Sequence, residues 1–308
     1  MNYKRVTNFI IRWLKDQIKQ RVKGTMLETR LRWFVKSLAP EKTILLDYPV
    51  KPRPRWEKNS PHQRIYDILN LNRAHYRKHL ESFLQFAPYF RRIPENFSSE
   101  NPLMPHWKNG WLPELDSLAL YSFVAIRRPK RYCEIGSGHS TKFVHKAITD
   151  HELDTQVISI DPHPRSGINS ICDQVIRQPV EDVDLQIFRN LQCNDILFVD
   201  NSHRVFMNSD VTTVFMDVFP MLAPGVIVQF HDIFLPYDYP ITWNEFYYSE
   251  QYLLAVYLLG GGEGYDILLP NTFVRHDAEL NRVLDPVWDD ERHKNVARDG
   301  ASFWLEKK

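Results

Sequence analysis

Glu134-Ile-Gly-Ser-Gly-His-Ser-Thr141 is the stretch of sequence that decides the fold. It ends a short apolar run at residues 132–135 and leads into a helical pattern at residues 143–148. A strand, a glycine turn and a helix form a corner that accepts anions, because the first N–H groups of a helix have no partner within it. Gly136 and Gly138 let the backbone approach such a ligand closely. The stretch therefore predicts a carboxylate- or phosphate-binding turn at the end of a strand.

Short apolar runs alternate with helical stretches in the rest of the chain beyond residue 130. Continuous apolar runs are typical of strands covered on both faces, and their alternation with helices predicts a parallel sheet with right-handed crossovers. We therefore predict an α/β fold, a Rossmann-like, doubly wound, seven-stranded and mostly parallel sheet with helices on both faces, preceded by an α-helical region. The predicted strands lie at residues 132–135, 157–160, 175–176, 196–199, 226–230, 265–269 and 301–305.

Composition limits the class of protein. With 308 residues, 43% of them apolar and 25% charged, the chain suits one large or two modest globular domains, which excludes a disordered or collagen-like protein. Half of the 20 prolines fall between Pro40 and Pro113. This uneven distribution predicts two regions, a helical and Pro-rich one at residues 1–112 and an α/β domain at residues 113–308.

The three cysteines, Cys133, Cys172 and Cys193, have no CxxC spacing. We therefore expect neither a disulfide framework nor a structural zinc site. No apolar run approaches the ~18 residues of a membrane span, and the first residues lack the pattern of a signal peptide. These features predict a cytoplasmic protein.

Charge is distributed unevenly along the chain. Residues 1–36 contain ten basic and two acidic side chains, so they carry +8 and the rest of the chain carries −7. Residues 9–22 follow a helical pattern with one apolar face. Such a basic amphipathic helix either lies on an anionic membrane surface, as a peripheral anchor, or packs on the protein body or on a second copy of the chain, and we favour packing. Because the rest of the chain is net negative, we expect no nucleic-acid partner.

A conspicuous acid follows the next predicted strand. Asp161 lies 25 residues after Gly136, and an acid near this spacing can accept hydrogen bonds from both hydroxyls of a ribose. An alternative is that Asp161 caps a turn. A dinucleotide site also requires a third glycine, where this chain has Gly138-His-Ser-Thr141. Hydride transfer by an NAD-dependent dehydrogenase is therefore disfavoured.

Three motifs together resemble those of class I S-adenosylmethionine-dependent methyltransferases. They are Glu134-Ile-Gly-Ser-Gly-His-Ser-Thr141, Asp195-Ile-Leu-Phe-Val-Asp-Asn-Ser-His203 and Gly225-Val-Ile-Val-Gln-Phe-His-Asp232. Within that superfamily the motifs are similar to the branch of catechol, caffeoyl-CoA and macrolide-sugar O-methyltransferases. The resemblance covers roughly residues 115–308.

The resemblance implies that S-adenosyl-L-methionine is the cofactor. In the positions that match, Ser140 would meet the methionyl carboxylate, Asp161 would hold the ribose, Glu181 or Asp182 would contact the adenine, and Asp200 would lie near the ammonium group. Glu181 and Asp182 could instead cap a helix. The glycines would line the methionine part of the cofactor, and the acid before them would also fix the turn. The implied cofactor-binding residues are Glu134, Gly136, Ser137, Gly138, Ser140, Asp161, Glu181, Asp182 and Asp200.

Polar side chains also follow the fourth and fifth predicted strands. Asp200 and His203 follow the fourth, and His231 and Asp232 end the fifth. The carboxyl ends of parallel strands share one edge of the sheet, so we expect these side chains to meet there. In one interpretation Asp200, His231 and Asp232 hold a divalent cation such as Mg²⁺ or Mn²⁺, which activates a substrate hydroxyl, and His203 accepts its proton. An imidazole ligand suits Mn²⁺, Fe²⁺ or Zn²⁺ better than Mg²⁺.

Two other interpretations of these side chains remain open. In a metal-free site, Asp200 stays near the cofactor and His203 or His231 is the base. Alternatively, both histidines are structural. The aromatic residues 234–252 would cover the exit of the fifth strand and exclude water, and Trp107 and Trp111 would either close the other wall or belong to the core.

The function that these features indicate is transfer of a methyl group to a hydroxyl of a small molecule. The alternatives are a non-catalytic methyltransferase-like binding or scaffold protein and an NAD-dependent dehydrogenase.

Overall fold

The computed structural model describes residue 44, residues 47–164 and residues 167–308. The chain separates into two units, Met1–Lys51 and Pro52–Lys308, and the second contains the whole sheet. The expected boundary at residue 113 falls inside the second unit. The helix predicted at residues 9–22 lies outside the described residues, so its binding to a membrane or to a second copy stays a prediction.

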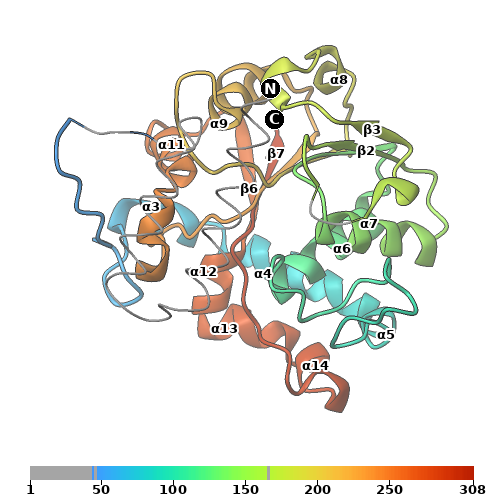
Figure 1. Cartoon of the computed structure of the whole chain (residues 1–308). Helices are drawn as coiled ribbons and strands as arrows, with labels where there is room; N and C mark the ends of the chain where they lie inside the picture. The colour runs from blue at the N-terminus through green and yellow to red at the C-terminus, as the bar shows by residue number, and fades with distance from the viewer. Residues whose placement is uncertain (1–43, 45–46, 165–166) are drawn as a thin grey trace, which may run out of the picture. The chain divides into compact units, whose positions relative to one another are not determined.

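A seven-stranded sheet forms the centre of the second unit (Figure 1), in the order β3-β2-β1-β4-β5-β7-β6. The first five strands are parallel, and β7 runs antiparallel to both of its neighbours. The mostly parallel, doubly wound sheet predicted from the apolar runs is therefore confirmed. The strands are β1 (Arg131–Ile135), β2 (Gln156–Ile160), β3 (Gln174–Ile176), β4 (Ile196–Val199), β5 (Ile227–Phe230), β6 (Tyr265–Pro270) and β7 (Phe303–Lys307).

Helices pack against both sides of this sheet (Figure 1). The α-helices are α3 (Gln63–Asn70), α4 (Arg73–Phe83), α5 (Ala87–Phe90), α6 (Glu114–Arg127), α7 (His139–Asp150), α8 (Gln186–Arg189), α9 (Asp210–Thr213), α10 (Phe219–Met221), α11 (Glu250–Leu259), α12 (Asn271–His276), α13 (Ala278–Asn281) and α14 (Asp285–Trp288). A π-helical turn, η5 (Val214–Val218), joins α9 to α10. Short 3₁₀ helices complete the connections: η2 (Leu84–Phe86), η3 (Asn169–Ile171), η4 (Val180–Asp182), η6 (Ile241–Phe246), η7 (Arg282–Leu284) and η8 (Glu291–His293).

One apolar core holds the unit together. The strands β4 and β5 are buried at every residue, as expected for strands covered on both faces. Helix α6 is buried from Leu115 to Ala125 and packs on α7 and α4, which is typical of a helix that is apolar nearly all round. Trp107 is 1% exposed and contacts Phe143 and Trp288. It therefore belongs to the core rather than to the wall of a site.

The helices before α6 share this core. Ile65 and Leu69 of α3 and Tyr76 and Leu80 of α4 are fully buried in the same cluster as the sheet. From residue 65 to residue 84 the apolar spacing predicts a single helix, closed by Pro88, and this prediction is wrong in detail. The helix breaks between α3 and α4, and Pro88 lies within the first turn of α5, where a missing N–H costs no helical hydrogen bond.

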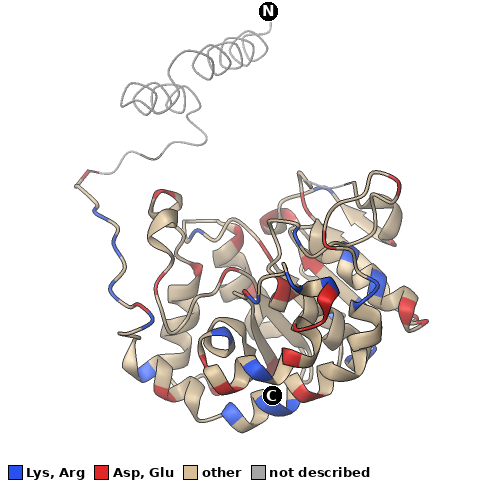
Figure 2. Cartoon of the chain, turned by 90° about the horizontal axis from the view of Figure 1, so that it is seen from below, with Lys and Arg blue, Asp and Glu red and all other residues tan. Residues whose placement is uncertain are grey.

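Basic and acidic residues are interspersed along the ribbon of the second unit (Figure 2). Among the described helices, none is both long and apolar enough to cross a bilayer.

Candidate active site

The glycine turn between β1 and α7 packs directly against the end of β4. Gly136 has a φ of +83°, and a Cβ atom there would lie 1.7 Å from the carbonyl oxygen of Asp200. Its N–H donates to the carbonyl of Ile160 at 2.9 Å, which ties the turn to the end of β2 as well. Gly136 is therefore required by the close approach of two strand ends. That approach also places Asp200 beside the turn.

Gly138 differs from Gly136, because a Cβ atom at Gly138 would meet nothing within 4 Å. It lines a small cavity of about 80 Å³ together with Ser137, His139, Ser140 and Asp200, with Trp111 and Leu112 at its side. The cavity lies at the N-terminus of α7, a 12-residue helix whose first N–H groups suit an anionic ligand. The turn predicted to accept a ligand therefore borders open space.

Glu134 fixes the glycine turn from beneath. Its carboxylate is fully buried and accepts hydrogen bonds from the hydroxyls of Tyr132 and Ser140, both at 3.1 Å, and of Thr141. Burial raises the pKa of Glu134 to about 7, although these hydroxyls lower it. Ser140 also lines the cavity, but its hydroxyl group donates its hydrogen bond to Glu134.

Asp161 joins the ends of β1 and β2. Its carboxylate accepts the backbone N–H of Ser137 at 2.9 Å and that of His163 at 2.7 Å. Arg177, beyond β3, donates to the carbonyl of Asp161 at 3.0 Å. The two strand ends that the sequence assigned to one nucleoside site are therefore adjacent. Each carboxylate oxygen keeps a lone pair for a further donor.

The two acids predicted to contact adenine lie in η4. Glu181 is half-buried, and its Oε2 has no hydrogen-bond partner among the described residues. Asp182 is exposed. Of the two, Glu181 is the one whose carboxylate has a buried acceptor still to satisfy.

A second group of polar side chains lies at the ends of β4 and β5, and we call it the His–Asp cluster: Asp200, His203, His231 and Asp232. The Nε2 atom of His203 lies 3.2 Å from Asp200 and 3.4 Å from Asp232. The Nδ1 atom of His231 lies 3.5 Å from Asp200 and 3.4 Å from Asp232. The four side chains expected to meet at this edge do so.

Two carboxylates that the sequence did not single out stand behind the histidines. Glu250, at the start of α11, is fully buried and lies 2.8 Å from Nδ1 of His203. Asp116, in the first turn of α6, is also fully buried and lies 3.6 Å from Nε2 of His231. Each imidazole therefore has one nitrogen next to a buried acid and its other nitrogen next to Asp200 and Asp232.

The carboxylates favour the protonated imidazoles. Burial lowers the pKa of His203, but hydrogen bonds to Asp200 and Glu250 outweigh it and raise the pKa to about 10. The pKa of His231 is raised well above its usual value, because Asp232 and Asp200 outweigh burial in the same way. Burial would raise the pKa of Asp200, but the two imidazoles lower it below its usual range. For Asp232, burial prevails and the pKa is raised.

The backbone of the cluster is held in an uncommon conformation. His203 has a φ of +59° and Asp232 a φ of +56°. Non-glycine residues in the left-handed region cost of the order of 1 kcal/mol each and persist where the surroundings determine them. Here the carbonyl of His203 accepts the N–H groups of Ser249 and Glu250, at 2.8 and 3.2 Å.

Asp200, His231 and Asp232 are also arranged as ligands for a cation. One ligand atom from each of them lies within 4.8 Å of the other two. Both ring nitrogens of His231 are buried and make no hydrogen bond with the described residues. An unsatisfied buried nitrogen beside two carboxylates is the donor set of a divalent metal site, so these residues fit the cation that the sequence suggested.

Aromatic side chains cover the end of β5. Phe234 and Tyr239 are buried and contact Trp243, and Tyr248 packs on the imidazole of His203 with 4.7 Å between ring centroids. Trp111 is 57% exposed and lies at the small cavity. Within this aromatic segment, Tyr248 therefore contacts the His–Asp cluster, and Phe234, Tyr239 and Trp243 pack on one another.

A comparison with known families finds a match within the second unit. A family model described as a methyltransferase domain matches residues 133–233, from β1 to the residue after Asp232. The match contains the glycine turn, Asp161 and the His–Asp cluster. Residues 133–233 are thus similar to a methyltransferase domain, and the matched stretch includes every residue that the sequence assigned to cofactor, metal or base.

One curated relative matches part of this chain. An uncharacterized protein of Archaeoglobus fulgidus is 33% identical over 136 residues, which is 42% of this chain. The match spans 60% of the length of that relative.

Two solved structures are more distant. A methyltransferase of Podospora anserina, PaMTH1, bound to SAH, is 17% identical with a TM-score of 0.40, over 74% of this chain and 88% of that one. An O-methyltransferase of Bacillus cereus in complex with SAH is 14% identical with a TM-score of 0.31, over 75% of this chain and 90% of that one. Similarities of this size assign neither a cofactor nor a substrate to this chain.

Proposed function

We propose that this protein transfers the methyl group of S-adenosyl-L-methionine to a hydroxyl group of a small molecule. The observation that carries the proposal is the position of Asp200. It lines the cavity at the glycine turn with Ser137 and Gly138, and it also contacts both histidines of the His–Asp cluster. A cofactor in the cavity and a hydroxyl at the cluster would be neighbours across this one side chain.

The cofactor supplies an electrophilic methyl group on a sulfonium, and the protein's part is to bind and orient both partners and to accept a proton. The N-terminus of α7 and Ser137 suit the methionyl end, and Asp161 suits the ribose. The aromatic side chains over β5 reduce access of water to the cluster, which strengthens electrostatic interactions within it.

His203 is the base that the geometry favours. Glu250 lies at hydrogen-bond distance from Nδ1, so it holds the tautomer in which Nε2 faces Asp200 and Asp232. With a pKa near 10 the imidazole is protonated at neutral pH. Once Asp200 and Asp232 are engaged by a cationic group, they no longer favour the protonated form, and Nε2 can accept the hydroxyl proton.

Asp200, His231 and Asp232 would hold a divalent cation, with Asp116 behind His231. A cation there would lower the pKa of a substrate hydroxyl. Because His231 offers nitrogen, the set favours Mn²⁺ over Mg²⁺. If the site works without metal, Asp200 serves the cofactor alone and His231 becomes the alternative base.

Calorimetry with S-adenosylhomocysteine tests the cofactor site. We expect the wild-type chain to bind it and to show no heat with NAD. A chain that binds NAD and not S-adenosylhomocysteine would be a dehydrogenase, and one that binds neither would be a non-catalytic member of the fold.

The transfer itself is tested with His203→Ala. We expect methyl transfer to a panel of hydroxylated small molecules, with Mn²⁺ or Mg²⁺ present, to fall at least a hundredfold in the variant. Its affinity for S-adenosylhomocysteine should stay within about twofold, because His203 does not line the cavity at the turn. His75→Ala, an exposed histidine on α4, is the matched control. Equal turnover in the two variants would reject His203 as the base.

A further inference from the structure

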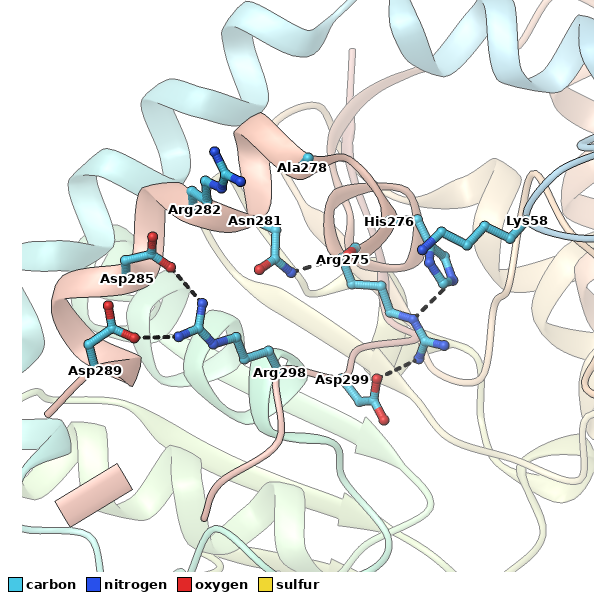
Figure 3. A pocket seen from close by; sticks show the side chains of 10 residues that line it. All are labelled: Lys58, Arg275, His276, Ala278, Asn281, Arg282, Asp285, Asp289, Arg298 and Asp299. Carbon is cyan, nitrogen blue, oxygen red and sulfur yellow. Dashed lines mark hydrogen bonds and ion pairs between the residues drawn. The ribbon is translucent and has the colours of Figure 1, made fainter. Parts of the chain in front are cut away.

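A second cavity, of about 580 Å³, lies outside the site described above (Figure 3). Its walls come from Lys58, from the region of α12 to α14, and from Arg298 and Asp299 before β7. None of the residues predicted for cofactor, metal or base lines it. The volume lies within the range of small-molecule sites, ~300–1,000 Å³.

The lining of this cavity is charged rather than apolar, so an occupant must be polar. Seven of the ten lining residues carry a formal charge: the cations Lys58, Arg275, Arg282 and Arg298 and the acids Asp285, Asp289 and Asp299. A cavity of this composition selects its ligand by charge.

Every acid of the cavity already has a cationic partner. Arg298 contacts Asp285 at 2.5 Å through Nη1 and Asp289 at 2.6 Å through Nη2 (Figure 3). Arg275 contacts Asp299 at 3.1 Å. These contacts fix both guanidinium groups in place. Two guanidiniums pair with three carboxylates, so the ion-paired residues together carry a net charge of −1.

Two cations of the cavity have no such partner. The side chains of Lys58 and Arg282 make no ion pair or hydrogen bond with the described residues of the chain. His276 adds no positive charge, because burial lowers its pKa to about 4. The four cations and three acids of the lining thus give the cavity a net charge of +1, although the residues beyond 36 together carry −7.

We infer that this cavity binds a small molecule that carries a phosphate-type oxyanion. Lys58 and Arg282 would supply the unpaired positive charge. Arg275 and Arg298 would add the N–H groups that their ion pairs leave over, since a guanidinium has five donors. Arginines held in place by acids suit such a ligand, because little side-chain entropy is lost on binding. The inference does not depend on the methyl-transfer site.

Calorimetry of the full chain with inorganic pyrophosphate at low ionic strength tests the inference. The variant is Lys58→Ala/Arg282→Ala. Both side chains are exposed, and neither holds another element in place. The matched control is Lys78→Ala/Arg189→Ala, which removes two exposed cations of α4 and α8. We expect pyrophosphate to bind the wild type and the control equally, and the pocket variant at least tenfold more weakly.

Either of two results would overturn the inference. One is that the wild-type chain gives no heat of binding with millimolar pyrophosphate. The other is that the two double variants weaken binding to the same degree, or not at all, which would mean that pyrophosphate responds only to overall charge. A thermal-unfolding series on the same three proteins provides an independent readout, because a ligand that binds the native state raises the Tm.

Discussion

The ends of β1 and β2 and the ends of β4 and β5 lie at the same edge of the sheet, yet they treat their polar groups in opposite ways. At the first pair, Glu134 accepts hydrogen bonds from three hydroxyls, and Asp161 accepts hydrogen bonds from two backbone N–H groups. At the second, both ring nitrogens of His231 and Oε1 of Glu250 are buried without a hydrogen bond from the described residues.

The ends of β1 and β2 therefore form a support in which these polar groups already have hydrogen-bond partners. The ends of β4 and β5 form a site in which buried polar groups still lack them. Buried polar groups are nearly always satisfied, and exceptions are expected where a ligand or ion completes them. The glycine turn is therefore shaped before any ligand arrives. The His–Asp cluster keeps unmet hydrogen-bonding and ligand capacity, as a reacting centre requires.

Gly136→Ala should have the largest effect, because it disrupts the glycine turn that supports the cavity. A methyl group at this position overlaps the carbonyl of Asp200 and sits on a backbone with a φ of +83°. We expect a loss of at least about 4 kcal/mol of unfolding free energy, measured by urea denaturation.

Gly138→Ala is the control for this prediction, since its Cβ meets nothing within 4 Å. It should leave the unfolding free energy within about 0.5 kcal/mol of wild type. It should still weaken binding of S-adenosylhomocysteine, because Gly138 lines the cavity. Equal unfolding free energies of Gly136→Ala and Gly138→Ala would contradict the assignment of Gly136 to the support and of Gly138 to the cavity.

Glu250→Gln changes a side chain that contacts the His–Asp cluster, and it should reduce turnover about a hundredfold. An amide can donate to Nδ1 of His203 and so favour the wrong tautomer, while the shape of the side chain is kept. Turnover and cofactor affinity are measured separately, and the affinity should not change. Glu245→Gln, an exposed neighbour in η6, is the control. If Glu250→Gln keeps its turnover, Glu250 only supports the fold.

Asp161→Ala should weaken binding of S-adenosylhomocysteine about tenfold, the loss expected for one hydrogen-bonding carboxylate. Calorimetry measures it. Asp182→Ala serves as the comparison, because Asp182 is exposed, and we expect a smaller loss there. An unchanged dissociation constant in Asp161→Ala would leave Asp161 as a residue that only joins the two strand ends.

The smallest effect should come from a histidine without acids around it. Burial lowers the pKa of His79 to about 4, with His75 and Arg127 adding to the effect. The folded chain therefore binds this proton less well than the unfolded chain, and stability that is present above pH 6.5 is lost as the pH falls toward 4. Between pH 7 and 5.5 we expect His79→Gln to lose about 1 kcal/mol less than wild type. Denaturant unfolding at both pH values checks this, and equal losses would contradict it.

The fold was predictable from sequence because its signals are local. Runs such as residues 196–199 and 226–230 are apolar throughout, and this is enough to identify buried strands. The meeting of Asp200 with His231 and Asp232 followed from one rule, that parallel strands end at a common edge. What the sequence got wrong, the single helix before Pro88, depended on where a helix can break, and periodicity does not report that.

The two acids behind the histidines could not be found in this way. Glu250 lies 47 residues after its partner His203, and Asp116 lies on a helix far ahead of His231 in the chain. Their pairing depends on how α11 and α6 pack, which no spacing encodes. The one available signal was an acid within an apolar helix, as Asp116 is between Leu115 and Leu118.

The strand β7 has a consequence for how a damaged copy of this protein would behave. The N–H groups of Ala301 and Ser302, just before it, bind the carboxylate of Asp116, and the strand itself fills the gap between β5 and β6. A polypeptide whose translation stopped before residue 301 would carry the complete set of cofactor and base residues in its sequence. It would nevertheless lack β7 and the two N–H groups that hold Asp116. A search for motifs would therefore score this shortened protein as intact, although it cannot complete its sheet or position Asp116 behind His231.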